Sequence, residues 1–544
     1  MSKQFTIWHL LALASLLYFP FLGTVHLFDW DEINFAEAAR EMLVTGNYLD
    51  VQIDYKLFWE KPPLFIWMQA ICMKIFGVNE FAARLPNAIA GLVTLVVLYK
   101  MGSHLKNKNF GLLWASMYLC SILPFFYFKS GIIDPWFNLF IFSGVYFAIV
   151  YTTFQPKGWY AAMAGVCIGL AILTKGPVAL LVFGLTSGIL VLIKKFRVPF
   201  QWKHLLWFIT ALLLVGGSWF FVQIAFGNTQ NVIDFIVYQI RLFRTKDAGH
   251  GGFLLYHFVI LFFGVFPASV FALTNLWGTK KIADTENETE SRENMIRLWI
   301  RILFWVVLLL FTYVSTKIIH YSSLCYFPLT YLATEVAIKW QENQGHVRSW
   351  QKGIFAGLAV LIGLVYTVVA AIEWYKPLLL EKVHIKDPFA VGNLGADVAW
   401  SGLEIIPGLI ILIAIWFVIR LKAAWFVPAI LALSLLFSAS AVMLLTPKVE
   451  KYSQNAMIEF CKAKEAEHAI VVPIGFKSYA HLFYTKKNLA ESAYPSNADI
   501  LTNRPEGIKI YGVIKINKKE KTFAKYPFLK LLYEKNGFVF VEAE

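Results

Sequence analysis

Charged residues are scarce in this chain of 544 residues, where they make up 15% of the total against 58% for hydrophobic residues. Because soluble domains carry about 25% charged residues, this composition excludes an ordinary soluble protein and predicts an integral membrane protein. Lys and Arg outnumber Asp and Glu by 49 to 35. In a multi-span protein such an excess usually lies in the loops on one side of the membrane. Since the chain has no recognisable nucleic-acid-binding module, we expect no nucleic-acid partner.

Cysteines and glycine-rich motifs are sparse as well. The five cysteines are scattered along the chain, which excludes a disulfide framework and a clustered cysteine site for a metal. The sequence lacks a Walker-type or Rossmann glycine motif, so we expect no nucleotide cofactor.

Long apolar runs occupy most of the chain up to residue 446. No A-x-A-like cleavage site follows the first run, so we interpret it as a retained span. Counting the runs long enough to cross about 30 Å of hydrocarbon predicts thirteen spans, and therefore a membrane protein of the all-α class. The spans are 6–27, 82–99, 110–128, 134–153, 159–174, 177–193, 204–226, 253–277, 298–316, 321–338, 353–373, 402–419 and 424–446.

The loop charges predict an orientation. Lys and Arg are more than twice as dense in the loops on the side of the N-terminus as in those on the other side. By the positive-inside rule the N-terminus is expected in the cytoplasm and the loop 28–81 outside. Since the number of predicted spans is odd, residues 447–544 are expected outside too. Strand patterns at Ala469–Ile474 and Ile508–Ile516, followed by an Asn-Gly hairpin signal, predict a small external α/β domain there, without catalytic residues.

The loop 28–81 concentrates acidic residues directly after the first span. Between Asp31 and Gly46, apolar residues fall on one helical face and polar residues on the other, which predicts a helix lying in the membrane interface. Asp31 stands at the expected N-cap of this helix, and capping alone would account for its residue type.

A second feature of the same loop is the sequence Glu60-Lys61-Pro62-Pro63. Because proline is tolerated in the first turn of a helix, we expect a second amphipathic helix to start after it. Glu60 and Lys61 would then be held just before that helix.

Further polar residues fall at the outer ends of predicted spans or in the loop 227–252: Asp134, Lys175, Lys317, His320, Tyr321, Arg241, Arg244, Asp247 and His250. Taken singly, each is more often a helix-end residue than a functional one. Together with the loop 28–81 they predict a cavity at the membrane surface with charges of both signs, which suits an amphiphile with an anionic head and a lipid tail.

The alternative is a transporter or lipid flippase, in which these charges would form a gate. Its best candidate residue is Glu335, inside the predicted span 321–338. Transporters place ionisable sites near the bilayer midplane, often in repeated halves, whereas most of these charges lie at one surface. This distribution favours an enzyme.

At these residues the sequence resembles a known family. DWDEINFAEAAREML, FWEKPP, IFGVNEFAARLP, the Asp134-Pro135-Trp136 sequence and LTKGP, followed by the loop containing His250, are similar to the bacterial aminoarabinose transferases and the protein mannosyltransferase-related branch of the GT-C glycosyltransferases. The resemblance implies a GT-C fold with a transmembrane catalytic domain at 1–446 and an external domain at 447–544. It also implies an enzyme of the bacterial inner membrane that moves a sugar from a polyprenyl phosphate carrier to a lipid, glycan or protein acceptor.

The resemblance implies a role for individual residues. Asp31 matches the catalytic aspartate, and Glu60 with His250 matches a pair associated with a divalent metal, for which Zn²⁺ or Mn²⁺ suits a carboxylate and an imidazole. An equally open alternative is that Glu60 pairs with Lys61 or an arginine and that His250 only hydrogen-bonds in its loop. The residues expected to bind the carrier phosphate or substrate are Lys61, Arg241, Arg244, Lys175, Tyr321 and Asp134.

Two positions depart from the aminoarabinose transferases. Asn34 stands where they have Arg, and Phe58 stands where they have Tyr. Both departures remove a phosphate contact that the resemblance would otherwise imply.

Overall fold

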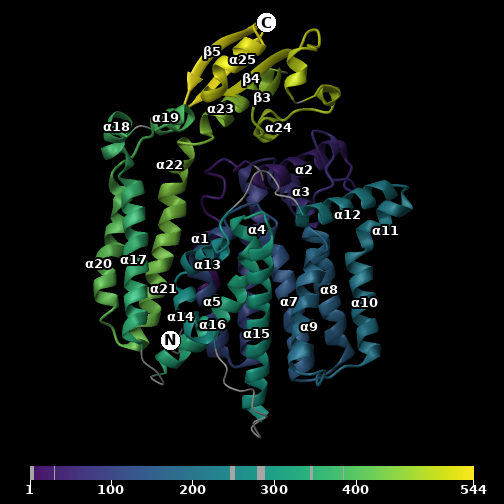
Figure 1. Ribbon diagram of the computed structural model, residues 1–544, viewed down its shortest axis with the longest axis vertical. Helices are drawn as coiled ribbons and strands as arrows, with labels where there is room; N and C mark the ends of the chain where they lie inside the picture. Colours follow the sequence, from purple (N-terminus) through teal and green to yellow (C-terminus); the bar gives the residue numbers. More distant parts are fainter. Residues whose placement is uncertain are drawn as a thin grey trace.

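The structure is a computed structural model that describes residues 5–29, 31–244, 252–277, 288–342, 347–383, 385–467, 469–495 and 497–544, without the side chains of residues 242–244. A bundle of apolar helices forms its body, and a small β-sheet lies at one end of the bundle (Figure 1). Within the described residues, six helices are long and apolar enough to cross a membrane: α4 (Glu80–Leu105), α7 (Asp134–Thr153), α8 (Gly158–Lys175), α15 (Glu288–Tyr313), α17 (Ser349–Ala370) and the continuous stretch Ala423–Lys451.

A seventh candidate span is bent. It consists of α10 (Trp202–Gly216) and α11 (Ser218–Ala225), which meet at an angle of 55°. Paired glycines commonly mark such a bend, and Gly216 and Gly217 lie at this one. Shorter apolar helices complete the set of described candidates: α1 (Ile7–Tyr18), α3 (Leu64–Phe76), α9 (Val178–Ile193) and the segment Leu403–Val418, which contains α20 (Ile406–Val418). The protein is thus a multi-pass membrane protein, whereas the count of thirteen spans stays a prediction.

Several predicted spans are interrupted in the structure. The run 204–226 contains the bend described above. The runs 110–128 and 253–277 are each divided into two shorter helices. The run 253–277 is divided just before α14 by Pro267, which lacks the backbone N–H that a continuous helix would need there. The helices of these two runs are α5 (Lys108–Leu119) with α6 (Ile122–Tyr127), and α13 (Tyr256–Gly264) with α14 (Ala268–Leu276).

Close backbone contact holds parts of the bundle together. A Cβ atom at Gly165 of α8 would lie 2.3 Å from the carbonyl oxygen of Phe208 in α10, and one at Gly169 would lie 2.7 Å from the backbone nitrogen of Gly216. Small residues therefore allow α8 and α10 to approach each other, as is common between membrane helices. The remaining helices of this part are α16 (Tyr326–Gln341), α18 (Ile372–Lys382), α19 (Pro388–Leu394) and α21 (Ala423–Ser440), which continues through a π-helical turn at Ala441–Leu445 into α22 (Thr446–Lys451). This helix runs across the predicted domain boundary at residue 446.

Three helices lie across the end of the bundle that faces the sheet (Figure 1): α2 (Asp31–Thr45), α3 and α12 (Thr229–Arg244). The predicted second helix of the loop 28–81 is confirmed as α3, whose N-cap is Pro63. The same loop also contains two short antiparallel strands that were not predicted, β1 (Gln52–Ile53) and β2 (Lys56–Leu57).

The helix predicted after Asp31 is confirmed as α2, but its polar face is buried and not exposed as an amphipathic interfacial helix would have it. Residues 32–42 of α2 are all buried, including the polar ones. Arg40 donates to both carboxylate oxygens of Glu37, at 2.8 and 2.6 Å, and Glu41 accepts the backbone N–H groups of Asp54 and Tyr55 at 2.6 and 2.8 Å. Burial and the neighbouring Glu37 raise the pKa of Glu41 to about 9. Polar residues can be buried on this face because each has a partner: the β1–β2 loop supplies those of Glu41, and Arg40 and Glu37 pair with each other.

The sheet forms the C-terminal part of the described chain. Its strand order is β3 (Ala469–Ile474), β4 (Lys509–Lys515), β6 (Phe538–Ala543) and β5 (Leu529–Lys535). β3 and β4 are parallel, and the other neighbours are antiparallel. The predicted strands and the hairpin are confirmed, and the turn residues Asn536 and Gly537 have the positive φ values, 49° and 78°, that this turn favours. Three short helices accompany the strands: α23 (Asn455–Lys464), α24 (Ala480–Thr485) and α25 (Lys519–Lys525).

This C-terminal part rests on the loop 28–81. The hydroxyl oxygen of Tyr484 in α24 accepts the backbone N–H of Leu27 at 2.7 Å, and Lys487 pairs with Asp54 at 2.5 Å. The hydroxyl group of Tyr55 donates to the carbonyl oxygen of Lys487 at 2.7 Å. The sheet therefore bounds the same space as α2.

Candidate functional site

Two aspartates from different elements face one histidine. His320 lies in a 3₁₀ turn, Ile319–Cys325, and its Nε2 is 3.4 Å from Oδ2 of Asp31 and 3.9 Å from Oδ2 of Asp134. The other oxygen of Asp134 pairs with the amine of Lys175 at 2.6 Å. Asp134 begins α7 and Lys175 ends α8, so two membrane helices present this ion pair at the same level.

Exposure separates the two aspartates. The side chain of Asp31 is 42% exposed, whereas that of Asp134 is only 3% exposed. The carboxylate of Asp31 therefore has room for another molecule, and that of Asp134 is held among protein atoms.

The start of α2 is anchored by the residue after Asp31. Glu32 accepts two hydrogen bonds from the guanidinium of Arg84, at 3.0 and 2.8 Å, and others from the backbone N–H groups of Phe28 and Gly131. Burial opposes ionisation of Glu32, but the charge and hydrogen bonds of Arg84 hold its pKa below the usual range. A buried carboxylate with this many partners fixes the first turn of α2, and with it the position of Asp31.

Lys61 lies half-buried between these acids and α12. Its amine is 6.0 Å from the ring centre of Tyr238 on α12. Burial lowers the pKa of Lys61, and nearby Glu60 opposes that shift. The backbone carbonyl of Glu60 accepts a hydrogen bond from Gln239 at 3.2 Å, which ties the segment before α3 to α12.

These residues border a polar cavity of about 570 Å³. Acidic and basic side chains from separate segments of the chain meet at its wall. The complete lining comprises Phe28, Asp29, Asp31, Glu32, Asn34, Phe35, Glu60, Lys61, Ile132, Ile133, Asp134, Lys175, Tyr238, Ile318, His320, Tyr321, Lys477 and Tyr479.

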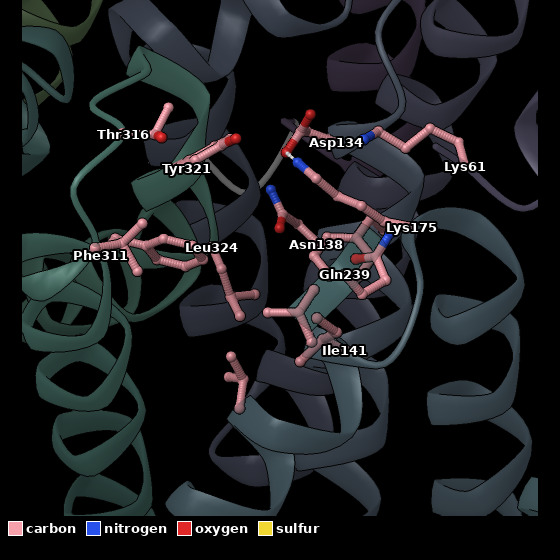
Figure 2. A pocket seen from close by; sticks show the side chains of 14 residues that line it. Lys61, Asp134, Asn138, Ile141, Lys175, Gln239, Phe311, Thr316, Tyr321 and Leu324 are labelled. Carbon is pink, nitrogen blue, oxygen red and sulfur yellow. Dashed lines mark hydrogen bonds and ion pairs between the residues drawn. The ribbon is translucent and has the colours of Figure 1, made fainter. Parts of the chain in front are cut away.

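A narrower cavity of about 90 Å³ adjoins the polar one and shares four of its lining residues: Lys61, Asp134, Lys175 and Tyr321. In Figure 2 the amines of Lys61 and Lys175 lie close to Asp134, and the apolar side chains Ile141 and Leu324 lie below them. Mainly apolar residues of α7, α9 and α15 line the rest of this cavity. The site is therefore polar on one side and apolar on the other.

The structure brings together six of the nine residues predicted for the site, since Asp31, Glu60, Lys61, Asp134, Lys175 and Tyr321 all line the polar cavity. Arg241 is not among the lining residues; it is exposed on α12, with its guanidinium 5.1 Å from the ring centre of Tyr238. Arg244 ends α12, but its side chain lies outside the described part of the structure, as does the whole of His250.

A metal can be tested only against the described residues, among which no group of three or more His, Cys, Asp or Glu side chains is arranged to hold an ion. Of the predicted pair, the described chain supplies Glu60, whose side chain lines the polar cavity. The metal assignment to Glu60 and His250 therefore stays a prediction.

Several lining residues were not predicted for the site. His320 was noted at a span end but not assigned a role, and Tyr238 was not noted at all. The C-terminal part, for which no catalytic residue was predicted, also borders the site: Lys477 and Tyr479 line the cavity, and the backbone N–H of Tyr479 donates to Asp29 at 3.2 Å. No local pattern marks these residues, since they reach the cavity through the packing of the sheet on α2.

Two other polar residues have structural partners. Glu335 of α16, the best candidate residue for a transporter, is buried. It pairs at 2.8 Å with Lys106, at the end of α4, and at 2.9 Å with Arg297 of α15. Lys317 donates to the backbone carbonyls of Phe311, Thr312 and Val314 at the end of α15. Both residues are thus accounted for by helix packing and helix capping.

Comparisons with known proteins give similar proteins and a fold. The family model described as dolichyl-phosphate-mannose-protein mannosyltransferase matches residues 60–221. A protein of Shewanella sediminis named undecaprenyl phosphate-alpha-4-amino-4-deoxy-L-arabinose arabinosyl transferase is 25% identical over 394 residues, 68% of each chain. A Proteus mirabilis protein named as a transferase of the same kind is 27% identical over 48% of this chain, and the match spans just over half, 55%, of its own length.

The fold matches that of a solved structure over nearly the whole chain. The crystal structure of ArnT from Cupriavidus metallidurans in the apo state has a TM-score of 0.76 at 17% identity, covering 99% of this chain and 98% of that one. The structure of the same protein bound to undecaprenyl phosphate has a TM-score of 0.75. Together the matches confirm the resemblance found in the sequence: the chain is a glycosyltransferase that is similar in sequence and fold to the aminoarabinose transferases of the GT-C type and in part to the protein mannosyltransferases.

Proposed function

We propose that this protein transfers a sugar from a polyprenyl phosphate carrier, such as undecaprenyl phosphate, to an acceptor on the outer face of the bacterial inner membrane. The observation that carries the proposal is the pair of adjoining cavities, one polar and one apolar, which share Lys61, Asp134, Lys175 and Tyr321. A lipid-linked sugar phosphate has the same division into a polar head and an apolar tail. The name of the Shewanella sediminis relative and the undecaprenyl phosphate bound to ArnT in its crystal structure add support for this donor class.

The charges suggest how the donor lies. Its phosphate would bind near the amines of Lys61 and Lys175, with Tyr321 close by, since the ring centre of Tyr321 is 5.2 Å from the amine of Lys175. The first units of the tail would follow the apolar cavity beside Ile141 and Leu324. This arrangement leaves the sugar in the polar cavity, on the side of Asp31.

The transfer breaks the bond between the anomeric carbon and the phosphate oxygen and forms a bond between that carbon and an acceptor oxygen. The phosphate leaves with the electron pair, and Lys61 stabilises its charge. If the acceptor is a hydroxyl group, Asp31 accepts its proton as general base. If it is a phosphate, which is already ionised, Asp31 orients it or supports positive charge on the sugar ring. A divalent ion bound by Glu60 and His250 would add positive charge beside the leaving phosphate.

The acceptor is proposed to be a lipid, glycan or protein that reaches the polar cavity from outside. The N-terminus would then be cytoplasmic, and the loop 28–81 and the C-terminal part of the chain external. Impermeant thiol reagents should label single cysteines placed at Asn47, Gly249 and Asn497 in intact cells with a permeabilised outer membrane, in a background without exposed native thiols. Protection of any of them would contradict a shared external face.

The experiment that tests the function is a comparison of polyprenyl-linked sugars and surface glycans, by mass spectrometry, in cells with and without the protein. One lipid-linked sugar should accumulate when the protein is missing, and one surface glycan, glycolipid or glycoprotein should lose that sugar. Purified protein should then transfer the identified sugar from its carrier in vitro. Unchanged levels of all lipid-linked sugars, with no transfer in vitro, would refute the proposal.

A further inference from the structure

His320 lines the polar cavity, but the donor and acceptor positions proposed above assign it no contact. Its imidazole is 14% exposed, and its Nε2 faces one carboxylate oxygen of Asp31 at 3.4 Å and one of Asp134 at 3.9 Å. Those oxygens belong to α2 and α7, so the ring connects the first loop to a membrane helix.

The proton on this ring can be located from its neighbours. A carboxylate oxygen can only accept a hydrogen bond when ionised, so a ring nitrogen that faces two of them must carry the proton. Burial lowers the pKa of His320; the charge of Asp134 opposes this shift, while that of Lys175 adds to it. The ring is therefore neutral near pH 7, with its proton on Nε2 and a lone pair on Nδ1.

The surroundings hold the ring in place. The hydroxyl of Ser323 donates to the carbonyl of His320 at 2.5 Å and accepts a hydrogen bond from Asn138 of α7 at 2.7 Å. The ring also packs edge-on against Tyr321, with ring centres 5.4 Å apart. Lys175 forms an ion pair with the other carboxylate oxygen of Asp134, the one that does not face His320. The order of contacts is thus Lys175, Asp134, His320 and Asp31.

We propose that His320 is a positioning residue for Asp31: it donates from Nε2 and holds the carboxylate of Asp31 in the orientation that the transfer requires. The inference rests on the proposed function, in which Asp31 acts on the acceptor. Asp31 is the most exposed member of this group, at 42%, so few other contacts restrict its rotation. The chemistry stays with Asp31, while His320 takes up no proton from the acceptor.

Substitutions at His320 test this role through its hydrogen bond. His320→Phe keeps a ring without a donor, and His320→Gln keeps an N–H donor on a shorter side chain. A misplaced catalytic group costs about 100-fold in rate, so His320→Phe should lower kcat by about that factor while leaving KM for the lipid-linked donor and binding of the carrier lipid unchanged. His320→Gln should retain more activity than His320→Phe, and added imidazole should restore part of the activity of His320→Ala.

A second measurement does not depend on activity. In protein labelled with ¹⁵N-histidine, the signals of His320, assigned from their loss in His320→Gln, should show the neutral form with the proton on Nε2. Asp31→Asn should shift the Nε2 signal, because the substitution changes the acceptor of that proton. A proton on Nδ1, or a signal that Asp31→Asn leaves unmoved, would overturn the proposal.

The outcomes separate this inference from the function on which it rests. Suppose that wild type transfers sugar and Asp31→Asn does not. A kcat of His320→Phe equal to that of wild type would then refute the positioning role and leave the proposed function intact. If wild-type protein transfers no sugar from any polyprenyl phosphate carrier, the proposed function fails, and the histidine spectra still decide whether His320 donates to Asp31.

Discussion

Arg84 of α4 binds Glu32 of α2 through two hydrogen bonds, at 3.0 and 2.8 Å, across 52 residues of sequence. The same guanidinium donates to the carbonyl oxygens of Leu22, Val25 and His26, just before α2. One arginine on a membrane helix thus fixes both the end of the first apolar segment and the start of the helix that carries Asp31. As a result, the exposed carboxylate of Asp31 extends from a helical turn whose position is fixed.

Because this turn is anchored independently of Asp31, Asp31→Asn is an informative variant. The substitution keeps the size of the side chain, while Glu32 and Arg84 keep α2 in place, so carrier binding and insertion should be unchanged. Loss of a general base lowers the rate by about 10²–10⁴, whereas loss of a helix cap would cost only about 1 kcal/mol of stability. Initial rates of transfer with saturating donor measure the difference.

A matched variant separates Asp31 from its acidic neighbour. Asp29 also lines the polar cavity, but its carboxylate accepts the backbone N–H of Tyr479, which the oxygen of asparagine would still accept. Asp29→Asn should therefore be much more active than Asp31→Asn. If the order of the two activities were reversed, Asp29 would replace Asp31 as the catalytic residue.

Lys61→Met should weaken binding of the carrier phosphate. A hydrogen bond to a charged group contributes about 1.5–3 kcal/mol, so the Kd for a short-chain polyprenyl phosphate should rise about 10- to 100-fold. Lys74→Met is the control, because Lys74 is an exposed lysine on α3, the helix that follows Lys61, and lies outside the cavity. Equal affinities of the two variants, measured by titration in detergent, would place the phosphate elsewhere.

How much of this site the sequence could predict depends on whether a residue's partners are local. Pro62-Pro63 before α3, the Asn536-Gly537 turn and the apolar runs act through their immediate neighbours, and all of them predict elements that the structure contains. The polar face of α2 could not be read in this way. Its amphipathic pattern is the same whether water or protein covers the polar side, and here the β1–β2 loop covers it.

Long-range packing also decides which residues reach the cavity. Asp134 and Lys175 could be expected there because each ends a span on the predicted outer side. Lys477 and Tyr479 lie more than 400 residues after Asp31, and only the docking of the C-terminal sheet brings them to the cavity. A single sequence contains no periodicity or spacing that encodes such a contact.

The buried acids of α2 predict a difference between two similar substitutions. Glu37 is the carboxylate partner of the buried Arg40, so Glu37→Gln leaves a buried charge without its pair and should destabilise the protein by about 3–5 kcal/mol. Glu41, with its pKa of about 9, already carries a proton at neutral pH. Glu41→Gln should therefore cost only about 1 kcal/mol, for one weakened hydrogen bond. Thermal unfolding in detergent compares the stability of the two variants. Equal losses of stability would contradict the prediction.

The same carboxyl group predicts a dependence on pH. Because the pKa of Glu41 is raised to about 9 in the folded protein and is about 4.3 when unfolded, the folded state binds its proton more tightly. Its contribution to stability is complete below about pH 4.3 and is lost as pH rises to about 9. The unfolding temperature should fall with pH more steeply in wild type than in Glu41→Gln, and equal slopes would contradict the raised pKa.

The last prediction concerns the metal. If Glu60 and His250 bind a divalent ion, purified wild-type protein should contain about one Zn²⁺ or Mn²⁺ per chain, because a carboxylate with an imidazole suits these ions better than Ca²⁺. Two protein ligands leave an incomplete coordination shell, so water or substrate oxygens must fill the other positions and the ion should be removable by chelators. Glu60→Gln and His250→Ala should each lose the metal, whereas His9→Ala, an exposed histidine on α1, should keep it. Metal content by mass spectrometry, together with transfer activity before and after chelation and metal return, decides the matter. Full activity in chelated protein without stoichiometric metal would show that Glu60 acts as a charge partner of Lys61 instead.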